Sequence, residues 1–250
     1  MEQETTAKKE NGSIIEEMFN AGAHYGYSKS RRHPSAKNVI FGVKNNVEVI
    51  DLEKTSKALD DAKEAVAAIA QAGKQILFVG GKYEAHGAII AGANAVGMPY
   101  ASHRWVGGTI TNFSEIKKRI AHLADLTEKK EKGAFTMYNK KERLMIDREI
   151  EDLKKHFEGL LEMSTTPGAL FVIDSKKEHI AVAEARAAGI PIISVSSSDN
   201  DLTLIDFPIP ANDASRSSIS FFVDQIVGAI KEGQKNTPKA KAPEVTEKTA

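Results

Sequence analysis

The chain has 250 residues, of which 41% are hydrophobic, and this is enough apolar material for one sizeable α/β domain with an appendage. It contains no cysteine, which excludes disulfide bonds, thiolate metal sites and cysteine nucleophiles. Lysine and arginine total 34, as do aspartate and glutamate, so the formal net charge is zero. No stretch has the apolar length of a membrane span, and the polar N-terminus lacks a signal-peptide core.

The charges are unevenly distributed along the chain. Every charged residue from Met18 to Val47 is basic, and from Ala65 to Ser114 the only acid is Glu84. A neutral protein with one basic face is typical of a component that contacts RNA on one side only. Chance segregation of charge explains the pattern equally well.

The first predicted elements are a short helix, a hairpin and a long helix. The short helix runs from Ser13 to about Ala21, and a basic loop from Tyr27 to Lys37 follows. Two β-rich runs, at 39–41 and 47–50, flank an Asn pair and are typical of a β-hairpin. Apolar residues on one stripe then predict a helix from about 53 to 72.

The next elements alternate between buried strands and helices. Strands are predicted at 75–79, 169–174 and 191–195, with a short edge strand at 207–209, where proline is tolerated. Helices are predicted at about 83–96, from the capping box at 175 to 189, and at about 214–230. Continuous apolar strands that alternate with helices indicate a parallel sheet covered on both faces.

Between residues 112 and 162 the pattern changes to two long helices with narrow apolar seams and charged exteriors. Asn112 with Glu115 and Asn139 with Glu142 are the predicted caps. The pattern indicates an inserted antiparallel hairpin that resembles a coiled coil. The predicted organisation is a disordered N-terminus at 1–12, an α/β domain at 13–111 and 163–232, the hairpin at 112–162 and a disordered tail at 233–250.

Two motifs are candidates for phosphate or base contacts. Gly80-Gly81-Lys82 follows a strand and opens a helix, where α/β proteins hold phosphate, although a tight turn with an exposed lysine is the simpler interpretation. His103-Arg104-Trp105, which contains the only tryptophan, can bind phosphate or stack on bases. A buried Trp105 at the base of the hairpin is an equally good interpretation, and the sequence does not separate the two.

Further candidates precede and follow these motifs. His24 and Tyr25 stand before the basic loop, and aromatic rings beside cations suit an irregular RNA surface, although an ordinary solvated loop with Tyr25 in the core is the simpler interpretation. The histidines have no metal-ligand spacing, so no metal site is expected. Ser196 to Asp201 lie beyond a strand end without a G-x-S-x-G elbow, so no catalytic residue is predicted.

Several of these stretches occur together in one order. They include Ala21 to Gly26, Ile50 to Thr55, Ile76 to Gly80, His103 to Gly108, Thr111 to Phe113, Leu170 to Asp174, Glu178 to Ala181, Gly189 to Pro191, and Asn212-Asp213. From about Ser13 to Gly233 the chain thereby resembles the S2 family of the bacterial small ribosomal subunit. The resemblance implies a flavodoxin-like or Rossmann-like sheet domain with a protruding coiled coil, no catalysis and no cofactor.

The resemblance also implies partners and a location. These are the ribosomal RNA of the small subunit and neighbouring small-subunit proteins, including the large protein of repeated OB folds, in the cytoplasm and in the ribosome; no membrane or DNA partner is expected. The candidate RNA-binding residues are His24, Tyr25, Lys29, Arg31, Arg32, Lys37, Lys82, His103, Arg104 and Trp105. The chain departs from the family pattern at Tyr27, at Arg32-His33, at Ser196-Ser197-Ser198 and at Ala211.

Two other functions remain open at this point. The chain could be an enzyme or nucleotide binder that uses the strand ends near Gly80, Asp174 and Ser196. It could also be an adaptor whose main surface is the hairpin at 112–162. Fold alone does not choose between these functions and an RNA-bound structural role.

Overall fold

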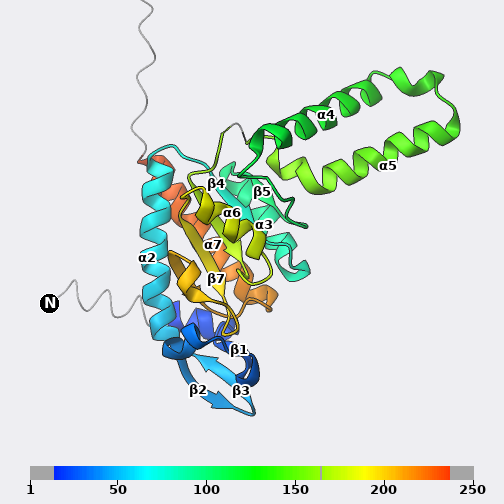
Figure 1. The fold of residues 1–250 in the computed structure, drawn as a ribbon. Coiled ribbons are helices and arrows are strands. Elements are labelled where there is room, and N and C mark those ends of the chain that lie inside the picture. The colour runs from blue at the N-terminus through cyan, green and yellow to red at the C-terminus, as the bar shows by residue number, and fades with distance from the viewer. Residues whose placement is uncertain (1–13, 164, 237–250) are drawn as a thin grey trace, which may run out of the picture.

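The computed structural model describes residues 14–163 and 165–236, and within them an α/β domain carries a projecting pair of helices (Figure 1). The expected disordered segment 1–12 and residues 237–250 of the expected tail lie outside the described residues. Among the described residues, no helix combines the length and apolar character needed to cross a membrane.

The N-terminal part forms a helix over residues 14–20 and a small antiparallel sheet. The sheet comprises β1 (Tyr25–Ser28), β2 (Ile40–Lys44) and β3 (Val47–Ile50), in the order β1-β3-β2. The predicted hairpin is confirmed as β2 and β3, and Asn45 and Asn46 turn it with φ of 51° and 63°. Positive φ at both central residues is what a type I′ turn requires. Strand β1 was not predicted, because its short sequence pairs only through tertiary contact with β3.

The large sheet has five parallel strands. They are β4 (Ile76–Val79), β5 (Tyr100–Ala101), β6 (Ala169–Ile173), β7 (Ile192–Ser196) and β8 (Phe207–Pro210). Their order is β5-β4-β6-β7-β8, and every neighbouring pair is parallel. Counted along the chain this is 2-1-3-4-5, the flavodoxin-like order, so the predicted fold class is confirmed. Strand β8 lies at the edge, where Pro208 and Pro210 are tolerated.

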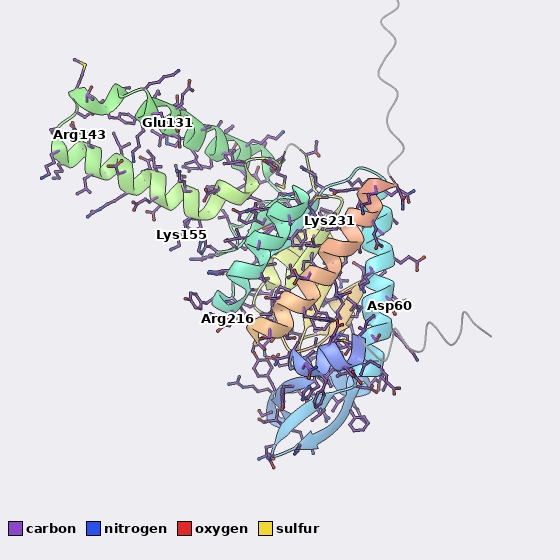
Figure 2. All side chains as sticks on the ribbon, turned by 180° about the vertical axis from the view of Figure 1, so that it is seen from behind. Asp60, Glu131, Arg143, Lys155, Arg216 and Lys231 are labelled. Atoms are coloured by element: carbon purple, nitrogen blue, oxygen red, sulfur yellow. The ribbon has the colours of Figure 1, made fainter. Side chains whose placement is uncertain are left out.

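Helices cover both faces of this sheet, as alternating side chains of the buried strands require. Ile76 and Phe78 pack on one side with α2 (Leu52–Gln71), α3 (Tyr83–Val96) and α7 (Arg216–Lys235). Figure 2 shows these three helices from behind. Leu77 and Val79 pack on the other side with α6 (His179–Ala187) and the base of the helix pair.

Two of these helices differ from the sequence prediction at their ends. Helix α6 begins at His179 rather than at 175, because residues 175–178 form turns after Asp174, which has a φ of 66°. The predicted capping box is therefore wrong. Helix α7 continues to Lys235, beyond the expected end at 230 and into the segment where a disordered tail was expected.

The projecting pair consists of α4 (Phe113–Glu131) and α5 (Lys140–Phe157), which run side by side in opposite directions (Figure 1). An ion pair of 2.7 Å between Lys130 and Asp147 and a hydrogen bond of 3.0 Å between His122 Nε2 and Glu149 Oε1 link them. The Asn139 capping box is confirmed, whereas Asn112 occupies the cap position without a capping hydrogen bond. Coiled-coil packing of the pair stays a prediction.

A close approach of α3 to α7 gives the first testable prediction. A Cβ on Gly92 would lie 2.4 Å from Cγ1 of Val223, whereas a Cβ on Gly87 of the same helix would meet no atom within 4 Å. We expect Gly92→Ala to lower the free energy of unfolding by about 1–3 kcal/mol in urea denaturation. The matched control Gly87→Ala should raise it by about 0.5–1 kcal/mol. If both substitutions changed the free energy of unfolding equally, α3 and α7 would be able to move apart without loss of stability.

Candidate nucleic-acid interface

The loops that follow the five parallel strands meet at one edge of the large sheet, because parallel strands all end on the same side. We call this the carboxyl edge; its residues are 80–82, 102–104, 174–178, 197–201 and 211–213. It contains the sequence motifs at Gly80-Gly81-Lys82 and His103-Arg104. The fold therefore brings together segments that are more than a hundred residues apart in the chain.

The basic loop predicted from the sequence is docked on the carboxyl edge. It contains the short 3₁₀ helices η1 (Lys29–Arg31) and η2 (Pro34–Val39). The backbone N–H of His33 donates to the Ser198 carbonyl at 2.9 Å, and that of Tyr27 donates to Ser198 Oγ at 3.0 Å. Leu202 N–H donates to Ser35 Oγ at 3.0 Å. These bonds fix the loop against residues 197–201 and present its cations at the rim of the sheet.

Lys82 lies inside this edge rather than on it. Its Nζ is 2.7 Å from Asp174 Oδ2 and 2.9 Å from Asp213 Oδ1, and it donates to the Asp213 carbonyl at 3.2 Å. All three residues are buried, so the interpretation of Lys82 as an exposed lysine is wrong. Burial alone would lower the pKa of Lys82, but the carboxylates of Asp213 and Asp174 raise it above its usual value. An ammonium held by two carboxylates is not available to a phosphate.

The same arrangement fills the place where flavodoxin-like sheets hold small ligands. That place is the topological switch point, where the strand order reverses. Here it lies between β4 and β6. The Lys82–Asp174 ion pair joins the ends of these strands. The backbone N–H of Gly81, a possible phosphate donor, instead donates to the buried Glu178 carboxylate at 3.1 Å. The geometry therefore does not favour a nucleotide enzyme at this point.

Trp105 is also buried, and it anchors the loop that leads to α4. Its Nε1 donates to Glu184 Oε1 of α6 at 3.1 Å. The Glu184 carboxylate also accepts from the backbone N–H groups of Gly108, Ile110 and Thr111 at 2.8–3.2 Å, and from the Thr111 hydroxyl. Burial would raise the pKa of Glu184, but the bonds from Trp105 and the backbone outweigh it and lower the pKa. Of the two interpretations of Trp105, the structure matches the structural anchor.

Two more predicted residues are engaged within the protein. Arg32 is half-buried, and its Nη1 lies 3.4 Å from Oε1 of Glu48, a fully buried carboxylate. His24 is buried and stacks on Phe19 with ring centroids 4.4 Å apart. Its neighbour Tyr25 is exposed, but it shares a cavity with Phe19 and the small sheet rather than with the basic loop.

The remaining predicted residues are accessible. Lys29, Arg31, Lys37 and Arg104 are exposed, and His103 is half-buried with its ring 4.6 Å from that of His86. Burial lowers the pKa of His103, and the neighbouring His86, Lys155 and His156 add to this effect.

The structure adds cations and aromatic rings that the sequence did not single out. The Arg31 guanidinium lies 5.7 Å from the centroid of Tyr27, and that of Arg216 lies 5.1 Å from the centroid of the exposed Tyr83. Lys155 lies on α5 near the base of the hairpin, and Arg216 lies at the start of α7 (Figure 2). No sequence signal separated these residues from other surface lysines and arginines, because only the fold places them beside the carboxyl edge.

Comparison with known proteins gives a consistent result. Residues 18–233 match the family model described as ribosomal protein S2. The chain is 46% identical over 216 residues to the small ribosomal subunit protein uS2 of Chlorobium phaeobacteroides, with 86% of each chain covered. It is 41% identical to the protein of the same name from Francisella philomiragia, over 94% of this chain and 99% of that one, and 38% identical to that of Cytophaga hutchinsonii, over 94% of each.

The Glu184 contacts predict a measurable loss of stability. Replacing Glu184 by Gln places an amide N–H₂ against backbone donors, so we expect Glu184→Gln to lower the free energy of unfolding by about 2–3 kcal/mol. Because the carboxylate has a lowered pKa, its contribution is present near neutral pH and is lost as the pH falls through that pKa. Fluorescence of Trp105, the only tryptophan, should shift to the red in the variant. An unchanged spectrum and stability would contradict the anchor.

The buried ion cluster predicts an unusual titration. Burial raises the pKa of Asp213 to about 6, against the lowering effect of Lys82. Because this pKa lies above that of the unfolded chain, the folded state binds the proton more tightly, and the contribution of Asp213 to stability falls as the pH rises from about 4 to about 6. Carboxyl ¹³C NMR should show the step, and Asp213→Asn should remove it. A midpoint below pH 4 would mean that Lys82 outweighs burial.

Proposed function

This chain belongs to the family of ribosomal protein S2, and we propose that it serves that family's structural role by laying the carboxyl edge of its sheet on ribosomal RNA. Its relatives are named as small ribosomal subunit proteins, and the chain is accordingly a structural constituent of the small subunit in the ribosome and not an enzyme. The RNA contacts of individual residues are our proposal.

The observation that carries the proposal is the separation of cations into two sets. Lys82 and Arg32 face buried carboxylates and hold the edge together. Lys29, Arg31 and Arg104 are exposed at or beside the same edge, and none of them forms an ion pair with another described residue. Free cations on a rigid rim are suited to RNA phosphates, which bind by charge and by release of counterions. A net charge of zero is compatible with this, because the contact is one-sided.

Aromatic rings beside these cations support RNA in particular. Tyr27 lies beneath Arg31, and the exposed Tyr83 lies beside Arg216. Rings and guanidinium planes of this kind stack on unpaired bases. We include His103 and Lys37 in the proposed interface because they are accessible, and we assign Trp105 and Lys82 a supporting role from within.

We also propose that the division into a sheet domain at 13–111 and 163–232 and a hairpin at 112–162 separates RNA contacts from protein contacts. Two exposed apolar surfaces suit neighbouring ribosomal proteins, including the large protein of repeated OB folds. One comprises Phe19, Tyr25, Phe41 and Val43 of the small sheet and its helix, and the other comprises Met137, Tyr138, Leu144 and Met145 at the hairpin tip. Of these residues Met137 is 95% exposed and Phe41 80%.

The RNA interface is tested by removing its free cations. For the triple variant Lys29→Ala, Arg31→Ala and Arg104→Ala, we expect weaker binding to small-subunit RNA and a shallower dependence on salt, by about 0.7–0.9 in log–log slope for each phosphate that is no longer neutralised. The assay is filter binding over a salt series. The control removes the same charge from the hairpin tip, as Lys140→Ala, Lys141→Ala and Arg143→Ala, and should keep the slope. An unaltered slope in the first variant would remove the carboxyl edge from the interface.

A further inference from the structure

A groove of about 730 Å³ lies between the basic loop and α6. One wall is a single stripe of α6, formed by His179, Val182, Ala183 and Arg186 at the helical spacing i, i+3, i+4, i+7. The other wall comprises Arg31, Arg32 and His33 of the basic loop, with Leu204 beside them. Its volume lies within the range of about 300–1,000 Å³ that is usual for small-ligand sites.

The acids of the groove are already engaged within the protein. Asp199 forms an ion pair of 3.0 Å with Lys176, and Asp201 accepts hydrogen bonds from the backbone and hydroxyl of Thr203 and lies 3.7 Å from His33. The bonds from Thr203, which include its hydroxyl, help to lower the pKa of Asp201. Both carboxylates therefore have partners within the protein, an ammonium for Asp199 and the Thr203 donors for Asp201.

Two arginines and a histidine of the groove lack such partners within the described residues, whereas Lys176 and Arg32 are paired with Asp199 and Glu48. The side chains of Arg186 and His179 are exposed and form no hydrogen bond or ion pair with another residue of the described ranges. The guanidinium of Arg31 also forms no hydrogen bond or ion pair within the described residues, and it lies over the ring of Tyr27. A guanidinium on each wall suits a phosphate that both can reach.

The interior of the groove is apolar between these charges. Ala183 and Leu204 supply an aliphatic surface over the buried Val182, and Leu204 is 42% exposed although it is a leucine. His33 and His179 supply flat rings at its rim. An apolar surface with flanking rings and guanidinium groups is suited to a base that has left its stack, together with its phosphate.

We propose that this groove binds one unpaired nucleotide of RNA, with its base on Ala183 and Leu204 and its phosphate between Arg186 and Arg31. The proposal rests on the RNA-binding function proposed above and names the element of RNA that this part of the surface takes.

The test uses the full chain and free nucleotides. In a ¹H–¹⁵N NMR titration with adenosine, guanosine, cytidine and uridine monophosphates, saturable shifts are expected at Val182, Ala183 and Leu204 at millimolar concentrations. Arg186→Ala should weaken binding roughly tenfold, and Arg143→Ala on the hairpin is the charge-matched control. Ala183→Phe should abolish the shifts, because it fills an exposed position of the stripe and keeps every charge.

Several outcomes would overturn the proposal. They are the absence of saturable shifts with all four nucleotides, equal binding of inorganic phosphate and nucleotides that survives Ala183→Phe, and shifts confined to other parts of the chain. Photocrosslinking in assembled small subunits should join an RNA base to the peptide around Leu204 or Val182. The groove can fail these tests while the salt dependence of RNA binding at Lys29 and Arg104 persists, so the two proposals are distinguishable.

Discussion

The buried ammonium of Lys82 is the interaction on which the carboxyl edge depends. It joins the loop after β4 to the loop after β6 through Asp174 and to the loop after β8 through Asp213. Removing one partner of such a cluster leaves an uncompensated buried charge, which costs far more than the pair contributes. Burial is the main reason why the pKa of Asp213 is raised although it lies beside a lysine, and the neighbouring Asp174 carboxylate adds to the increase.

A second carboxylate performs a similar task where the hairpin leaves the sheet domain. The Glu184 carboxylate accepts hydrogen bonds from Trp105 and from backbone N–H groups within residues 108–111, and these bonds hold that segment against α6. The chain therefore enters α4 from a fixed point. The same helix presents Arg186 and His179 on its opposite, exposed stripe. One short helix thus holds the hairpin from within and contributes to the basic surface outside.

These contacts fill the place at which a flavodoxin-like sheet usually binds a small ligand. In such folds the carboxyl ends of the strands usually remain open for a substrate or cofactor. Here ion pairs and the Glu178–Gly81 bond occupy that space, and the edge becomes a rigid rim whose outer cations are free. The fold is shared with many enzymes, but its use is decided by the side chains at this edge.

The sequence by itself determined the parallel sheet, the long helices, the Asn45–Asn46 hairpin and the two-helix insertion, because these follow from local periodicity and turn chemistry. It also located the basic loop and, through its motifs, the family. It did not determine β1 or the two-residue β5, whose pairing comes from distant strands. Only the tertiary structure decided that Lys82 and Trp105 lie inside while Arg31 and Arg104 remain outside. A lysine followed by a helix has the same local pattern in either place, and its burial depends on whether carboxylates from remote segments arrive to neutralise it.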